Sequence, residues 1–314
     1  GLVPSKHKGR GLIKLDKVYE FQVAHITEEN IPYPFIVNMC TEAQKAWGKP
    51  GAKRIPILPK NVDIEFLSNY ISAENTLNLP VGVEKSSLNV THYPFNKFYI
   101  NLVLSNGEGS NIFGKELAQF IGQKTTLPIE VIDFKRELEV MDSPHIIRHE
   151  SLEACKQAIN ELFSLVLYRN NTYKDALESG TEIEPFEQRV YMIQSVTALK
   201  SQLTGEDAKK LELILEKGNV KYNITIILVE QSKNLSSITF EQWFKQNVSL
   251  TDAIWVGSGI TDQFKLEIKN VNAEMRADID MTDEFGYVVR NGKATKVKLL
   301  NPIKEEEFDE QSVS

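Results

Sequence analysis

The feature that most constrains this chain is a regular alternation of strand-like and helical runs that begins near residue 61. The strand-like runs are short and rich in apolar residues, and they lie at 98–104, 129–134, 189–193, 222–229 and 253–256. The run at 222–229 is almost entirely apolar or β-branched, which is typical of a strand that is covered on both faces. Alternating strands and helices predict an α/β fold with a mainly parallel sheet and flanking helices.

Amphipathic helices are expected between these strands. Residues 151–168 carry one apolar stripe at helical spacing, made of Leu152, Cys155, Ile159, Leu162, Phe163, Val166 and Leu167. A second stripe of Leu211, Ile214 and Leu215 predicts a helix over 206–217, and Gly218 stands where a helix stop is expected. Near the end of the chain, Asn291-Gly292 separates two β-rich runs and predicts a hairpin over 286–300, because both residues tolerate positive φ.

The first 60 residues have a different pattern. Residues 11–23 predict a short hairpin, and 27–60 are rich in proline and glycine, with a helix near 39–47. We therefore expect a hairpin plus linker over 1–60, the α/β domain over 61–303 and an acidic disordered tail over 304–314. The hairpin that starts at Gly11 resembles the one that starts at Gly286, which predicts that it closes a preceding module of a tandem array. Two unrelated hairpins are the alternative.

Composition and charge argue against several classes of function. The net charge is −7 and no long basic stripe occurs, so nucleic-acid binding is disfavoured. The two cysteines, Cys40 and Cys155, do not indicate a disulfide framework, which favours a reducing compartment. We find neither an apolar run of membrane-spanning length nor a signal peptide, so we expect a soluble segment whose parent is anchored by other parts.

The stretch from Phe98 to Ile121 has the order strand, glycine-rich loop, helix, where nucleotide-binding folds place phosphates. The candidate nucleotide loop is Ser105, Asn106, Gly107, Glu108, Gly109, Ser110 and Asn111. A phosphate loop has Gly, four residues, Gly, Lys and then Ser or Thr. When its second glycine is placed on Gly109, Leu104 replaces the first glycine, Ser110 the lysine and Asn111 the Ser/Thr.

Each replacement weakens a nucleotide site. Ser110 carries no charge to neutralise the β- and γ-phosphates, and Asn111 is better suited to cap the helix than to bind Mg²⁺. Glu108 adds a negative charge, and two like charges about 4 Å apart cost about 4 kcal/mol at an effective dielectric near 20.

A second register, from Gly109 to Lys115, also fits the motif. We reject it because Phe113, Leu117, Phe120 and Ile121 form a helical stripe that places Lys115 inside the helix.

The second acidic position of an ATPase is also altered. After the strand at 189–193, an ATPase would carry Asp and Glu to hold Mg²⁺ and orient water. This chain has Gln194 and Ser195 there, and neither side chain acts as a general base at neutral pH. The two independent losses argue together against conventional hydrolysis, so we expect no catalytic residue.

Other polar and aromatic residues have simpler explanations. His145 and His149, with Glu150, form a weak metal pattern that lacks a third ligand, so we expect no metal. Asp133 fits a structural acid at a strand end better than a catalytic one, and Gln231 fits capping or packing better than sensing a γ-phosphate. Three aromatic residues fit a core better than a peptide groove, namely Trp243, Phe244 and Trp255.

Several segments together resemble the FtsK/SpoIIIE-type motor domains of the EssC/EccC group, the coupling proteins of bacterial type VII secretion. They are 9–11, 79–84, 132–135, the helix 151–168 with Tyr168-Arg169, 227–231 and 255–259, and the likeness covers about 9–303. The altered loop is most similar to the third, C-terminal ATPase domain of that group. The resemblance implies a RecA-like P-loop NTPase fold in the cytoplasmic part of a cell-membrane protein.

The resemblance also implies partners: secreted small helical-hairpin proteins, neighbouring ATPase modules of the same chain and a homo-oligomer such as a hexamer. In the group, the last module is associated with reading export signals. The first hypothesis is therefore a degenerate module for substrate recognition or regulation, with no cofactor beyond weakly held ATP and Mg²⁺. The second is a weak ATPase, in which the amides of 105–111 hold nucleotide and a neighbouring subunit supplies charge. The third is a structural spacer that binds neither.

Overall fold

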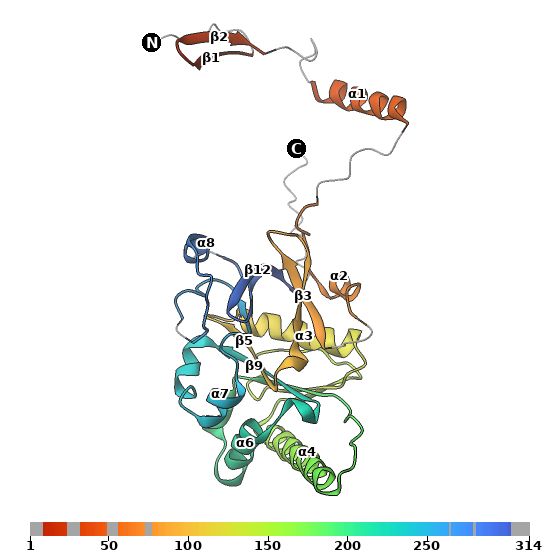
Figure 1. The fold of residues 1–314 in the computed structure, drawn as a ribbon, viewed down its shortest axis with the longest axis vertical. Helices are drawn as coiled ribbons and strands as arrows, with labels where there is room; N and C mark the ends of the chain where they lie inside the picture. The colour runs from red at the N-terminus through yellow and green to blue at the C-terminus, as the bar shows by residue number, and fades with distance from the viewer. Residues whose placement is uncertain are drawn as a thin grey trace, which may run out of the picture. The chain divides into compact units, whose positions relative to one another are not determined.

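The computed structural model describes residues 9–23, 32–48, 56–72, 77–263, 265–278 and 281–302, which divide into two compact units between Pro56 and Ile57. The predicted acidic tail over 304–314 lies outside these ranges. In the first unit, strands β1 (Arg10–Lys14) and β2 (Val18–Gln22) form the expected hairpin (Figure 1). Its helix α1 (Pro32–Trp47) begins well before the predicted start near residue 39.

The second unit is built on one ten-stranded sheet with the order β4-β3-β12-β11-β10-β5-β9-β8-β6-β7 (Figure 1). Six neighbouring strands are parallel, namely β10 (Ala253–Val256), β5 (Ile100–Ser105), β9 (Ile224–Gln231), β8 (Arg189–Gln194), β6 (Ile129–Ile132) and β7 (Ile146–His149). The other four strands are antiparallel, namely β11 (Phe285–Arg290), β12 (Lys293–Leu299), β3 (Asn78–Glu84) and β4 (Val90–Pro94). The predicted mainly parallel α/β fold is confirmed.

Helices cover both faces of the sheet, as its apolar strands require. One face packs against α2 (Ile64–Ser68) and α3 (Gly109–Lys124). The other packs against α4 (Leu152–Ser179), α5 (Val196–Gln202), α6 (Gly205–Lys217) and α7 (Gln242–Asn247). The short elements are α8 (Ala273–Ala277) and the 3-10 helices η1 (Phe95–Lys97), η2 (Val220–Tyr222) and η3 (Ser232–Ser237). None of the helices in the described ranges has both the length and the apolar character that a membrane crossing requires.

Strand β9 shows why the sequence dictates this layering. Its residues point alternately to opposite faces, so Ile226 and Leu228 join the core under α4–α7 while Ile227 and Val229 join the core under α3. A strand that is buried on both faces needs apolar residues at every position, which explains its nearly continuous apolar run. The aromatic residues predicted to be core are also buried, with Trp243, Phe244 and Trp255 at most 2% exposed.

Three features of this unit differ from expectation. Strands β3, β4 and β7 were not predicted, and within β3 Pro80 breaks the strand pattern. Proline is tolerated there because the register of β3 against β4 shifts between Pro80 and Gly82, which is an irregularity that needs no N–H donor. Helix α4 continues to Ser179, where Gly180 ends it at φ 69°, and Leu167 of the predicted stripe is 47% exposed.

Gly218 ends α6 at the predicted position, but for another reason. Its φ is −63°, so it does not adopt the left-handed conformation of a helix-terminating glycine. A Cβ atom at Gly218 would lie 1.8 Å from the Tyr99 ring, and the Tyr99 hydroxyl donates to the Ile214 carbonyl. A close approach of the aromatic ring therefore selects glycine here.

The two cysteines should differ sharply in reactivity. Cys155 is fully buried in α4, its thiol donates to the His149 carbonyl, and burial raises the pKa of the thiol to about 11. Cys40 is exposed on α1. Because the thiolate is the reactive form, we expect Cys40 to react with a thiol reagent at pH 7.5 at least about 100-fold faster than Cys155. Mass spectrometry of a labelling time course measures both rates, and equal rates would contradict the buried placement of Cys155.

Candidate functional site

The candidate loop lies at the carboxyl edge of the parallel strands, between the end of β5 and the start of α3. Ser105 is the last residue of β5, Asn106 to Glu108 form the loop, and α3 begins at Gly109. A Cβ atom at Gly109 would lie 2.7 Å from Asp283 Oδ1 and 2.9 Å from Val256 Cγ1, so a larger residue here would displace one of these side chains. The strand–loop–helix order predicted from the sequence is therefore present, and Lys115 of the rejected register lies inside α3.

The interior of the loop is filled by its own hydroxyl groups. Ser105 and Ser110 are fully buried, and their Oγ atoms are 2.9 Å apart. The Ser110 amide donates to Ser105 Oγ at 3.0 Å, and the Ser105 hydroxyl also lies 2.6 Å from the Gly107 carbonyl. A phosphate loop binds phosphate through free backbone N–H groups. At Ser110 that donor is already used.

The prediction that Asn111 caps the helix is wrong. The residue before the helix is Glu108, whose carbonyl accepts from the amides of Asn111 (2.9 Å) and Ile112 (3.2 Å). Ser105 already supplies the side-chain acceptor for a first-turn amide, so Asn111 is not needed as a cap. Its side chain instead extends away from the helix, where Nδ2 donates to Glu108 Oε2 at 2.7 Å and to Glu137 Oε2 at 3.2 Å.

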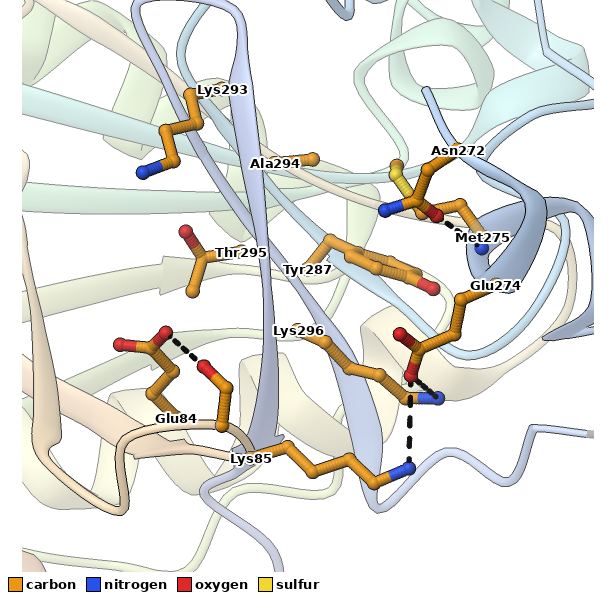
Figure 2. Close-up of a pocket in the computed structure, with 11 residues that line it drawn as sticks. Glu84, Lys85, Asn272, Glu274, Met275, Tyr287, Lys293, Ala294, Thr295 and Lys296 are labelled. Carbon is orange, nitrogen blue, oxygen red and sulfur yellow. Dashed lines mark hydrogen bonds and ion pairs between the residues drawn. The ribbon is translucent and has the colours of Figure 1, made fainter. Parts of the chain in front are cut away.

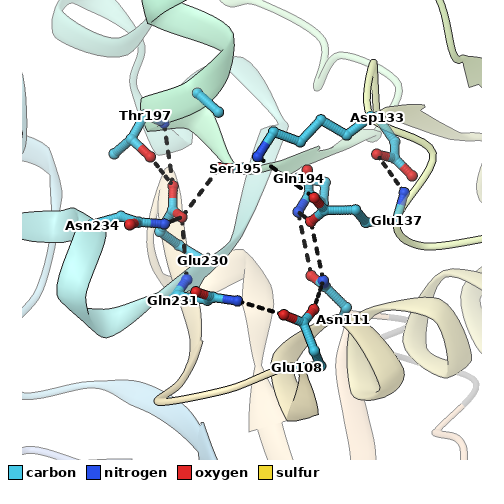
Figure 3. Close-up of polar contacts among 12 residues, drawn as sticks. Glu108, Asn111, Asp133, Glu137, Gln194, Ser195, Thr197, Glu230, Gln231 and Asn234 are labelled. Carbon is cyan, nitrogen blue, oxygen red and sulfur yellow. Dashed lines mark hydrogen bonds and ion pairs between the residues drawn. The ribbon is translucent and has the colours of Figure 1, made fainter.

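A network of acid and amide side chains lies beside the loop, and we call Glu108, Asn111, Glu137, Gln194 and Gln231 the plug (Figure 3). Gln231, at the end of β9, donates to Glu108 Oε1 at 2.8 Å. Gln194, at the end of β8, donates to Glu137 and, at 3.4 Å, to Asn111 Oδ1. The plug joins the ends of β8 and β9, the loop after β6 and the start of α3, and among the described residues Gln194 Oε1 is buried without a hydrogen-bond partner.

Glu137 was missed by the sequence reasoning, and Asp133 explains how it is placed. Asp133 follows β6, and its carboxylate accepts from the amides of Glu137 (3.1 Å) and Leu138 (2.8 Å). Burial raises the pKa of Asp133, although these two amides oppose the shift. Asp133 is therefore a structural acid that folds the following loop, and this loop carries Glu137 onto Asn111 and Gln194.

The two residues at the second acidic position, Gln194 and Ser195, lie in different environments. Gln194 belongs to the plug and is 3% exposed, whereas Ser195 lies outside it. The backbone of Ser195 adopts φ 50°, a left-handed conformation that residues other than glycine rarely adopt. Its hydroxyl donates to Glu230 Oε1 at 3.3 Å. The structure therefore brings Gln194 next to the candidate loop and directs Ser195 toward Glu230.

Glu230 was also missed, although a carboxylate at the end of an entirely apolar strand was a usable signal. It is 2% exposed and accepts from Thr197 N, Thr197 Oγ1, Gln231 N and Asn234 Nδ2 as well as from Ser195. These donors satisfy both carboxylate oxygens. Glu230 thus holds the starts of α5 and η3 against the end of β9.

The charges around the loop are predominantly negative. The partners of Glu108 in the described part of the chain are side-chain amides, and Asp283 Oδ1 approaches the backbone of Gly109. Lys135 contributes a positive charge beside the plug, where it pairs with Glu137 at 3.5 Å. The acidic side chains of this site repel a triphosphate, and the Ser110 amide is already used within the loop.

The histidine pattern does not gather into one site. His145 precedes β7 and His149 ends it, so extended backbone separates them by roughly 13 Å. His149 instead contacts Glu130 at 3.1 Å. Within the described ranges, no group of three or more His, Cys, Asp or Glu side chains is arranged to hold a metal ion.

A separate cavity of about 460 Å³ lies between α8, β12 and the end of β3 (Figure 2). Its floor is apolar, formed by the Tyr287 ring, Met275 and Ala294. Lys296 is neutralised by Asp278 at 2.7 Å. Hydrogen bonds from Ser86 and Ser87, together with the charge of nearby Lys293, lower the pKa of Glu84, which also lines the cavity. The cavity therefore offers an apolar surface beside the cationic side chain of Lys293.

The plug should behave as a coupled unit. Glu137→Ala leaves the buried Gln194 amide without its main acceptor and should cost about 1–3 kcal/mol of unfolding free energy, whereas Gln194→Ala leaves Glu137 open to water and should cost less. The double variant should lose at least about 1 kcal/mol less than the two single losses combined. Urea unfolding of the four proteins measures this coupling, and additive losses would show that the contact contributes nothing.

No protein-family model and no curated protein matches the sequence. Solved structures do match. The cytoplasmic domain of EssC is 18% identical with a TM-score of 0.64, over 95% of this chain and 59% of that chain. EssC (ATPases 2 and 3) from Geobacillus thermodenitrificans is 16% identical with a TM-score of 0.67, over 95% and 56%. Thermomonospora curvata EccC (ATPases 2 and 3), in complex with a signal sequence peptide, is 17% identical with a TM-score of 0.57, over 96% and 55%.

These matches establish the fold. The second unit has the RecA-like α/β fold of the EssC and EccC cytoplasmic ATPase domains, as the sequence resemblance predicted. The chain spans between 55% and 59% of the length of these three solved chains.

Proposed function

We propose that this chain is a degenerate ATPase module of a type VII secretion translocase, which recognises or regulates exported protein and does not hydrolyse ATP efficiently. The observation that carries this proposal is the plug, whose side chains bond to one another where nucleotide would enter. The EssC/EccC fold supports the setting in protein export.

Catalysis of phosphoryl transfer needs fixed positive charge around the phosphates. The loop supplies two serine hydroxyls and the carboxylate of Glu108 instead, and the acid position after β8 holds Gln194. Glu230 is engaged by five donors, and Glu137 by Asn111, Gln194 and Lys135, so neither carboxylate is free to orient water. The module accordingly serves as a scaffold that binds other parts of the machinery.

Recognition of an exported protein is the role that fits this scaffold best. The EccC relative was solved with a signal sequence peptide, and this chain has a cavity with an apolar floor beside the cationic side chain of Lys293. An apolar side chain next to an acidic group is the peptide chemistry that such a cavity accepts. The proposed partners are secreted small helical-hairpin proteins, the neighbouring modules of the same chain and copies of it in a homo-oligomer. The proposed location is the cytoplasmic part of a cell-membrane protein.

A binding titration tests recognition directly. Fluorescently labelled C-terminal peptides of the secreted helical-hairpin proteins of the same organism should bind the purified chain without nucleotide. Lys293→Glu reverses the charge beside the apolar floor, so it should weaken binding at least about tenfold, which corresponds to about 1.4 kcal/mol. Lys209→Glu, on the exposed side of α6, makes the same charge change far along the chain and should leave affinity unchanged. Absence of binding by any peptide, or equal effects of the two variants, would refute recognition at this cavity.

A second candidate is a weak ATP-binding motor domain that is completed by neighbouring subunits. The retained strand–loop–helix order at the carboxyl edge favours it. It differs from the main proposal in one measurable respect, because it requires Mg-ATP to displace the plug.

A further inference from the structure

Another cavity lies at the carboxyl edge of the parallel strands, between the starts of α5 and η3. Its volume is about 460 Å³, and two lysines, Lys135 and Lys233, line it together with uncharged side chains. Among the described residues that form its lining none is acidic, although the net charge of the chain is −7. The lining of this cavity is therefore opposite in charge to the candidate loop.

The order of the strands explains why the two lysines line one cavity. Lys135 lies in the loop after β6, and Lys233 lies in η3, directly after β9. Strand β8 lies between β6 and β9, and neighbouring strands are about 4.8 Å apart, so these two strand ends are separated by about 10 Å. Lysine side chains are long and flexible, so one anion above the end of β8 is within reach of both ammonium groups.

Lys135 is available to such an anion, although it pairs with Glu137 at 3.5 Å. The two side chains are 40% and 34% exposed, and an ion pair in contact with water contributes little free energy. Lys233 is exposed as well. A phosphate group carries about −1.5 to −2 charges at pH 7, so it attracts Lys135 more strongly than one carboxylate does.

The hydroxyl groups of the cavity have a different role from the lysines. Ser195 and Thr197 donate their hydroxyl hydrogens to the Glu230 carboxylate, at 3.3 and 2.9 Å (Figure 3). A hydroxyl group has one hydrogen, so both oxygens are left as acceptors. Glu230 is 2% exposed and holds this orientation. Acceptors of this kind bind the hydroxyl groups of a ligand and not its phosphate oxygens.

We propose that this cavity binds a small phosphate monoester that also carries hydroxyl groups. Lys135 and Lys233 bind the phosphate group, and Ser195 and Thr197 accept hydrogen bonds from the ligand hydroxyls. The volume lies within the range of about 300–1,000 Å³ that is usual for small-molecule sites. The ligand is a free monoester, whose charge is not neutralised by a bound metal ion as that of Mg-ATP is. The site is separate from the cavity in Figure 2 and from the recognition of exported protein proposed there.

Calorimetric titration of the purified chain with glycerol 3-phosphate, at fixed ionic strength, tests the site. Binding should be saturable, with a dissociation constant of about 1 mM or tighter. Lys135→Glu and Lys233→Glu should each weaken it at least about tenfold, because each places a negative charge beside the phosphate. Lys174→Glu, on the exposed later turns of α4, makes the same charge change and should leave affinity unchanged. Absence of saturable binding, or equal effects of the three variants, would overturn the inference.

Inorganic phosphate and glycerol are the matched probes for the two halves of the ligand. Inorganic phosphate should bind at least about fivefold more weakly than glycerol 3-phosphate, because it lacks the hydroxyl groups that Ser195 and Thr197 accept from. Glycerol alone should produce no saturable heat. Equal affinity for inorganic phosphate and glycerol 3-phosphate would contradict the role assigned to the two hydroxyl oxygens.

Three further variants and measurements locate the binding. Lys233→Arg keeps the charge and should retain binding, and the melting temperature of Lys233→Glu should equal that of the unaltered chain because the side chain is exposed. Gly107→Asp adds a negative charge to the candidate loop, where a side chain meets no other atom within 4 Å, and should not change the affinity for glycerol 3-phosphate. Binding that Gly107→Asp abolishes and Lys233→Glu leaves intact would place the phosphate in the loop and refute the site.

Discussion

Replacing Glu230 with alanine should lower the free energy of unfolding by at least about 3 kcal/mol, which corresponds to about 6–12 °C in melting temperature for a unit of this size. The carboxylate is 2% exposed and accepts from five donors. Truncation leaves these donors without an acceptor in a place that water does not reach, and it also removes packed atoms. Differential scanning calorimetry measures the change.

Two variants provide the comparison for Glu230→Ala. Glu230→Gln keeps the shape but halves the acceptor capacity, so its loss should be intermediate. Glu178→Ala removes an exposed carboxylate on α4 and should stay within about 0.5 kcal/mol of the unaltered chain. If Glu230→Ala were as mild as Glu178→Ala, Glu230 would not hold α5 and η3 against β9.

Reversing the charge of Glu108 should raise affinity for Mg-ATP about 10–100-fold. Glu108 is exposed at the mouth of the loop, so Glu108→Lys costs little burial, and it replaces a repulsion with an attraction about 4 Å from the phosphates. It also removes the acceptor that binds Asn111 and Gln231 in the plug. Equilibrium dialysis with labelled nucleotide at low ionic strength measures the gain.

Salt and a second variant separate this local effect from net charge. The gain from Glu108→Lys should shrink strongly at 0.5 M salt, because exposed charges are screened over a few ångströms there. Glu178→Lys changes the net charge of the chain equally, far along the sequence, and should have no measurable effect. An equal gain from both variants would mean that nucleotide responds to overall charge and not to the loop.

The parallel half of the fold could be predicted because a strand that is buried on both faces needs a nearly continuous apolar run, which is visible in the sequence. Strand β10 matches its predicted run, and β9 lies within two residues of its own. The antiparallel half was harder, because Pro80 and Gly82 in β3 resemble breaks although the irregular pairing with β4 accommodates them. Helix α4 was predicted too short, since its later turns are largely exposed and lose the apolar stripe.

Only those parts of the candidate site that follow one another in the sequence could be predicted. The strand, loop and helix from Phe98 to Ile121 follow one another in sequence, so their arrangement was visible. Glu137 was not, because a loop folded by Asp133 brings it to Gln194 from 57 positions away. Asn111 was assigned to a cap because sequence does not show that Ser105 already accepts from the first turn.

The plug also joins the two altered motifs to each other. Asn111 and Gln194 replace two groups that would bind Mg²⁺, and in this structure they bond to each other at 3.4 Å. In an active ATPase, a Mg²⁺ ion would bridge the two corresponding groups. Here the carboxylate of Glu137 accepts from the amides of both Asn111 and Gln194. The roles of Ser105 to Asn111 toward nucleotide remain predictions that binding experiments decide.

Isothermal titration of the purified chain with Mg-ATP tests the central claim most directly. We predict no saturable heat up to about 1 mM nucleotide, because an affinity weaker than that amounts to less than about 4.1 kcal/mol of binding free energy. Gly107→Asp serves as the control, since a side chain at Gly107 meets no other atom within 4 Å and adds negative charge at the loop. Micromolar binding by the unaltered chain that Gly107→Asp abolishes would contradict the account.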